Sequence, residues 1–115
     1  MKEKFLGNAS KTICTYYDQI KNLVLKSDTD IYEQINKSML TLKKKKRGVV
    51  WLEPNRNIMK VYFTKGKYKT SYYEVFPDGW GGYPYIKVKS DQFDLKAIQM
   101  LVDQAINKVN NVIAK

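Results

Sequence analysis

The residue types that most often carry enzyme chemistry are scarce in this sequence. It has no histidine and one cysteine, Cys14, so the usual neutral-pH proton shuttle and a histidine-activated thiol are both missing. One pattern resembles a metal-dependent nuclease: Pro77-Asp78 followed by Asp94-Leu95-Lys96. That chemistry needs the acids and the lysine to converge on one divalent ion. The sequence instead places Asp94 and Lys96 in the first turn of a helix, so we expect no catalytic site, metal or cofactor.

The basic residues are more informative. Lysine and arginine number 21 against 11 acidic residues, which gives a net charge of +10. Residues 41–70 contain ten bases and one acid and so carry nearly all of the excess. A surface with this charge attracts polyanions such as nucleic acid. The bases of this segment are Lys43, Lys44, Lys45, Lys46, Arg47, Arg56, Lys60, Lys65, Lys67 and Lys69.

Aromatic residues near this basic segment could stack on bases. The stacking candidates are Tyr62, Tyr68, Tyr72, Tyr73 and Trp80. Lysine outnumbers arginine 19 to 2, which favours contacts to phosphates over base-specific contacts. We therefore predict a non-catalytic domain that binds DNA or RNA with low sequence specificity. Two alternatives stay open: the lysines solubilise one face while the aromatics pack within a sheet, or the chain is a regulatory module that docks on an acidic protein surface. A metal-dependent nuclease is the least favoured.

Hydrophobic periodicity predicts the elements that position these residues. Apolar residues spaced by three and four predict a helix over residues 10–25, with Ser10 as its N-cap and Cys14 beside its buried stripe. Alternation predicts strands within residues 31–42, 49–52, 58–64 and 85–89. We expect residues 43–47 at a hairpin tip and the strand over 49–52 to end before Pro54. Helical spacing returns from Leu95 to Val112.

This order of elements predicts one α+β domain over residues 1–115. Its two layers are an antiparallel meander of about five strands, preceded by a helix, and a C-terminal helix packed on the sheet. The longest apolar runs have four or five residues, whereas a membrane span needs about 20. No signal peptide is visible, so we expect a cytoplasmic protein without a membrane partner. The pattern leaves the oligomeric state open.

One distinctive motif is the Gly79-Trp80-Gly81 loop followed by a strand and a helix. It occurs together with Tyr16-Tyr17 and Ile20, Ile31-Tyr32-Glu33, Thr41-Leu42-Lys43-Lys44, Val50-Trp51-Leu52-Glu53-Pro54, Met59-Lys60-Val61-Tyr62-Phe63 and Ile86-Lys87-Val88-Lys89-Ser90. On these segments the chain resembles domain-of-unknown-function family 5655, a prokaryotic family, whereas residues 64–76 fit that family poorly. The family is similar in layout to YjbR-like proteins, whose double-wing architecture has been proposed to bind DNA. The resemblance implies this fold and DNA binding, and it carries over no catalytic residue.

Overall fold

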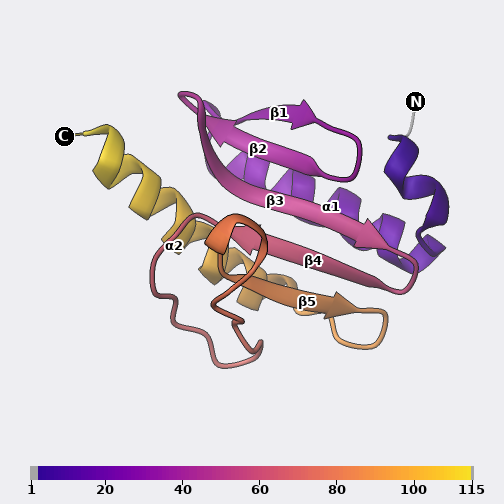
Figure 1. Ribbon diagram of the computed structural model, residues 1–115. Helices are drawn as coiled ribbons and strands as arrows, with labels where there is room; N and C mark the ends of the chain where they lie inside the picture. Colours follow the sequence, from indigo (N-terminus) through magenta and orange to yellow (C-terminus); the bar gives the residue numbers. More distant parts are fainter. Residues whose placement is uncertain (1–2, 115) are drawn as a thin grey trace.

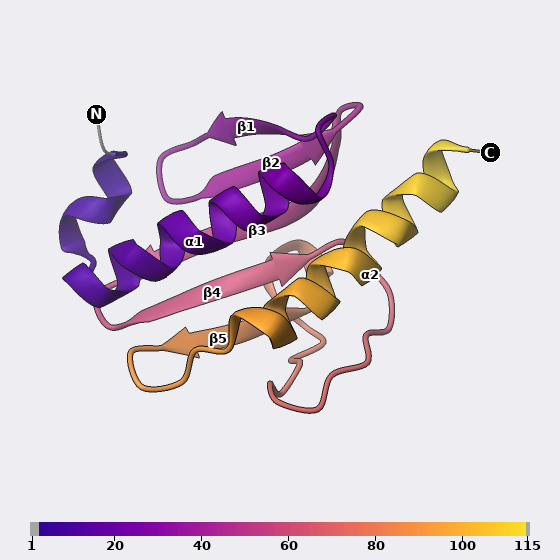
Figure 2. The ribbon, with the colours of Figure 1, turned by 180° about the vertical axis from the view of Figure 1, so that it is seen from behind.

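The computed structural model describes residues 3–114 and confirms the predicted α+β architecture. Five antiparallel strands form one sheet in the order β1-β2-β3-β4-β5. Both long helices lie on the same side of this sheet (Figures 1 and 2), and we call the opposite side the open face. The elements are η1 (Lys4–Asn8), α1 (Lys11–Ser27), β1 (Tyr32–Ile35), β2 (Leu40–Lys44), β3 (Arg47–Asn55), β4 (Ile58–Phe63), η2 (Trp80–Gly82), β5 (Tyr85–Lys89) and α2 (Leu95–Ile113).

α1 begins at its predicted cap Ser10, and α2 begins after Asp94, which the structure places as its N-cap. Ser10 Oγ accepts a hydrogen bond from the Ile13 amide (3.1 Å), and Asp94 Oδ1 accepts one from the Ala97 amide (3.0 Å). Their apolar stripes, which include Tyr17 of α1 and Leu101 of α2, pack against the sheet and form the main core. Within residues 3–114, neither helix is apolar enough over its length to cross a membrane.

Strand alternation sets which side chains reach each face. In β4, Met59, Val61 and Phe63 enter the core under the helices, whereas Lys60 and Tyr62 lie on the open face. β5 repeats this pattern, with Ile86 and Val88 in the core. The alternation in β4 and β5 therefore places lysine and tyrosine side chains on the open face.

The expectation that the strand over 49–52 ends before Pro54 is wrong. β3 continues to Asn55, and Pro54 is buried opposite Met59 of β4. The Val49 carbonyl accepts a hydrogen bond from Thr64 of the neighbouring chain segment, so alternate residues of β3 direct their backbone groups toward β4. Pro54 is one of the other alternate residues, so its backbone faces β2. The β2–β3 ladder stops at the pair between Leu40, the first residue of β2, and Leu52, so β2 has no residue opposite Pro54. Its missing N–H therefore costs no ladder hydrogen bond.

Candidate nucleic-acid interface

The β2–β3 hairpin ends in a two-residue turn made entirely of lysine. Lys44 and Arg47 are cross-strand partners, so the turn residues are Lys45 and Lys46. Both have positive φ angles, of 47° and 67°. Positive φ at both central positions is typical of a type I′ turn, which favours Asn-Gly because these residues tolerate the left-handed region. A lysine in that region costs on the order of 1 kcal/mol.

The two turn lysines are exposed at the end of this hairpin. Across residues 3–114, no carboxylate lies within ion-pair distance of either ammonium group. Arg47 follows them on β3, and Lys43 lies two residues before Lys45 on β2 and donates a hydrogen bond to Gln34 (3.0 Å), a neutral partner. The tip therefore presents several positive charges that the described fold does not neutralise.

Lys44 belongs to the same run but has a different environment. Its ammonium group forms an ion pair with Asp28 (2.6 Å) and donates a hydrogen bond to Asn110 of α2 (2.7 Å). The side chains of Lys44 and Asp28 are each only 13% exposed. The hydrogen bond from Lys44 holds the pKa of the Asp28 carboxyl below its ordinary value. Lys44 thus joins the end of α1, β2 and α2, and its charge is already matched.

The remaining basic candidates are divided between the two ends of the sheet. Lys65 and Lys67 follow β4, whose last residue, Phe63, pairs with Val50 near the start of β3. They therefore lie at the same end as the lysine turn, which we call the tip end (Figure 1). Arg56 lies in the β3–β4 turn at the opposite end, and Lys60 is within the open face. The backbone of Lys69 is hydrogen-bonded to Gln104 of α2, away from that face.

An aromatic cluster covers part of the open face. Residues 77–84 cross this face in front of the strands (orange in Figure 1). The rings of Trp80 and Tyr83 contact Trp51 of β3, and Trp80 also contacts Tyr62 of β4. The Trp51 ring centroid lies 4.4 Å from that of Tyr83 and 6.2 Å from that of Trp80. We define the aromatic cluster as Trp51, Tyr62, Trp80, Tyr83 and Tyr85.

The stacking candidates differ in accessibility. Tyr62 is 3% exposed and Tyr73 is 5% exposed, so neither ring offers a free face to a base. Tyr68 is half-buried against Phe63 with the Lys108 ammonium over its ring. Trp80 and Tyr72 are 54% and 44% exposed. Only Trp80 and Tyr72 of the five stacking candidates are therefore well exposed, although the sequence alone did not distinguish them.

Two of the buried phenols are fixed by hydrogen bonds. The Tyr62 hydroxyl donates to Glu53 (2.9 Å), and burial together with this bond raises the pKa of Tyr62 above its ordinary value. The Tyr73 hydroxyl accepts a hydrogen bond from the Asp94 amide (2.9 Å), and burial raises the pKa of Tyr73 to about 12. These tyrosines therefore stay neutral. Tyr62 joins β4 to β3, and Tyr73 joins the loop after β4 to the start of α2.

Three lysines lie against rings on the open face. The ammonium nitrogen of Lys65 is 5.4 Å from the Tyr83 centroid, that of Lys60 is 5.4 Å from Tyr85, and that of Lys87 is 4.7 Å from Phe76. Contacts of this kind hold a cation beside an aromatic surface. Sequence reasoning missed Tyr83 and Lys87, although the alternation of β5 placed Lys87 opposite the core residues.

The acidic residues of the nuclease-like pattern have other positions. Asp94 caps α2 through its carboxylate, and Asp78 lies in the loop before η2. Among the described residues, no group of three histidine, cysteine or acidic side chains is arranged to hold a metal ion.

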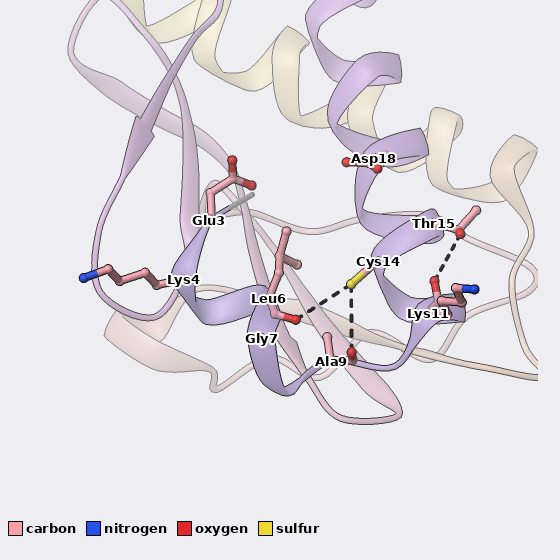
Figure 3. A pocket seen from close by; sticks show the side chains of 9 residues that line it. All are labelled: Glu3, Lys4, Leu6, Gly7, Ala9, Lys11, Cys14, Thr15 and Asp18. Atoms are coloured by element: carbon pink, nitrogen blue, oxygen red, sulfur yellow. Dashed lines mark hydrogen bonds between the residues drawn. The ribbon is translucent and has the colours of Figure 1, made fainter. Parts of the chain in front are cut away.

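A separate hollow of about 640 Å³ lies between η1 and α1 (Figure 3). Its lining includes Cys14, whose thiol sulfur lies 3.8 Å from the Leu6 carbonyl oxygen and 3.9 Å from that of Ala9. These weak hydrogen bonds join η1 to α1, in agreement with the predicted position of Cys14 at the border of the core. The lining of this hollow also contains the lysines Lys4 and Lys11.

No family model, curated protein or solved structure matches the chain. The resemblance to family 5655 therefore stays a prediction, and any function has to be argued from the surface described above.

Proposed function

We propose that this protein is a non-catalytic nucleic-acid-binding domain that contacts phosphates through the tip end of its sheet. The observation that carries the proposal is the lysine pair of the β2–β3 turn. Lys45 and Lys46 occupy left-handed backbone positions that lysine adopts at a cost in stability, and the described fold gives their charges no acidic partner. A backbone strained at a charged, exposed tip is typical of a position kept for binding.

The surrounding charge favours a phosphate backbone over a single anion. Lys43, Arg47, Lys65 and Lys67 lie near the turn, so positive charge is spread along one end of the sheet. Lysine contacts phosphates as a point charge and reads bases poorly, so we expect binding to DNA or RNA with low sequence specificity. Lys44 is outside this proposed interface because its ammonium group is paired with Asp28.

The test is fluorescence anisotropy over a salt series with single-stranded DNA, duplex DNA and RNA. The variant Lys45→Gln/Lys46→Gln removes two charges from the tip, and the matched control Lys26→Gln/Lys96→Gln removes two from exposed positions on the helices. For a single strand, each lost phosphate contact makes the slope of log affinity against log salt shallower by about 0.7. We expect a change of about 1.4 for the tip variant, if each lysine makes one contact, and little change for the control. Equal slopes in the two variants would refute the proposal.

A protein-interaction module is the second candidate, and the edge strand β1 favours it. All four residues of β1 are exposed, including Tyr32 and Ile35, and its outer edge has no strand partner within the described chain. An extended peptide can add to such an edge. This function predicts a stoichiometric protein complex that survives nuclease treatment and is lost when Ile35 is replaced by proline.

A further inference from the structure

The loop that carries Trp80 is fixed to the open face by its backbone. The Gly79 amide donates to the Tyr83 carbonyl (3.0 Å), and the Gly82 amide donates to the Gly79 carbonyl (2.9 Å). Gly81 and Gly82 have φ angles of 65° and 80°, which glycine adopts without strain. A Cβ at Gly79 would overlap the Tyr83 carbonyl and the Tyr85 ring. The loop is therefore closely packed, and the position of Trp80 is set before any ligand binds.

Trp80 is nevertheless more than half exposed. Its ring stacks on Tyr83 (5.8 Å between centroids, 26° between planes) and meets Trp51 and Tyr62 edge-on. These contacts place Tyr83 against one face of the indole, and Trp80 stays 54% exposed to solvent. A fixed aromatic ring with an open face matches the platforms on which proteins stack unpaired bases, because little freedom is lost on binding.

Basic groups lie on the same face beside this platform. Lys65 is held over Tyr83, the ring on which Trp80 stacks. Lys43 is the cross-strand partner of Gly48, and the Trp51 indole covers Gly48, so the Lys43 backbone lies next to the cluster, while its ammonium group donates to Gln34 of β1. Beyond Lys43 the hairpin continues into the lysine turn. Positive charge thus runs from the platform to the tip.

We infer that the ligand is single-stranded nucleic acid, with one unpaired base stacked on Trp80 and the adjoining phosphates near Lys65, Lys43 and the lysine turn. This inference rests on the proposed function and deepens it. A duplex contacts the same lysines through its backbone, but its internal bases are covered on both faces by neighbouring pairs. The platform therefore adds affinity for a single strand and none for the interior of a duplex.

The experiment compares Trp80→Ala with wild type on oligothymidine, oligouridine and a long duplex. Stacking on an aromatic residue strengthens binding about tenfold or more per base, so we expect Trp80→Ala to lose about tenfold on both single strands. Affinity for the duplex stays unchanged, and Trp80→Phe recovers most of the loss. The matched control is Met100→Ala, which removes an exposed apolar side chain of α2, on the opposite side of the sheet from Trp80, and leaves single-strand affinity unchanged. Oligothymidine should also quench tryptophan fluorescence in wild type and not in Trp80→Phe, where only buried Trp51 is left.

The outcomes separate the two proposals. If Trp80→Ala binds all ligands as wild type does while Lys45→Gln/Lys46→Gln weakens them, the stacking inference is wrong and the proposed function stands. If Trp80→Ala loses affinity equally for single strands and duplex, the preference for single strands is wrong. If wild type binds no nucleic acid at low salt, both proposals fail.

Discussion

At the scale of single residues, the lysine turn should affect stability and binding in opposite directions. Replacing its lysines should stabilise the fold and weaken nucleic-acid binding. Lys45→Asn/Lys46→Gly installs residues that accept positive φ, so we expect the free energy of unfolding to rise by about 1 kcal/mol. The same change removes two unpaired charges from the tip and should weaken nucleic-acid binding. Urea denaturation and anisotropy on the same preparations measure the two effects. A variant that is both more stable and binds as well as wild type would contradict the proposed role of the turn.

The ion pair between Lys44, one position before the turn, and Asp28 should contribute a stability that depends on pH. Because the pKa of Asp28 is lowered in the folded state, the Asp28 carboxylate stabilises the fold above its unfolded pKa of about 3.9. This contribution is lost as pH falls through the lowered folded pKa. Asp28→Asn should therefore cost about 2 kcal/mol at neutral pH, the range for hydrogen bonds to charged groups.

Urea titrations at about pH 7 and about pH 2 test this difference, which should shrink at the acidic pH because wild-type Asp28 is then protonated. Asp30→Asn is the matched control two residues away, since Asp30 is exposed. A cost for Asp28→Asn that stays equal at both pH values would contradict the ion-pair explanation.

At the scale of elements, β3 depends on a close contact between its own residues. The Trp51 indole lies over Gly48, and a Cβ there would overlap the ring. Gly48→Ala must displace Trp51 from the aromatic cluster, so we expect a loss of about 2 kcal/mol, within the range for overpacked sites. Gly7→Ala is the matched control, because nothing lies within 4 Å of its new methyl group. Thermal denaturation distinguishes them, and equal melting temperatures would disprove the contact.

The elements with regular periodicity could be predicted from the sequence, and those set by a neighbour could not. α2 and β5 follow from spacing alone, and β5 was predicted with the bounds that the structure has. The prediction that β3 ends before Pro54 is wrong because a strand can contain proline where no neighbouring strand needs its N–H group. Whether β2 extends opposite Pro54 cannot be read from the residues around Pro54. Similarly, the predicted tip over residues 43–47 contracts to a two-residue turn, since strand pairing extends to Lys44 and Arg47.

The candidate site was predictable in charge but not in accessibility. A count of bases locates the basic segment, yet the partner of Lys44 is Asp28, sixteen positions away. Tyr62 and Trp80 are both aromatic residues near turns, but one is buried beneath the other because residues 77–84 fold back over the sheet. Such long-range packing decides which side chains a ligand can reach, and local patterns do not record it.

At the scale of the whole molecule, the proposed interface occupies one end of an elongated sheet. β3 has nine residues, so the lysine turn and Arg56 are separated by about 30 Å along the strand. At physiological ionic strength the screening length is about 8 Å, and a charge at the far end then contributes little to an interface at the tip. We therefore expect Arg56→Gln to leave affinity for a short oligonucleotide nearly unchanged under these conditions, while Lys65→Gln weakens it.

Lower salt should reduce this contrast. At about 0.01 M salt the screening length grows to about 30 Å, comparable to the length of the strand, so both substitutions should then lower affinity. Anisotropy at the two ionic strengths, with Lys96→Gln on the helix side as the matched control, measures the effect. A short oligonucleotide that depends as strongly on Arg56 as on Lys65 at physiological salt would place the binding surface along the whole sheet. That result would contradict an interface confined to the tip end, because screening leaves direct contact as the only way for Arg56 to contribute.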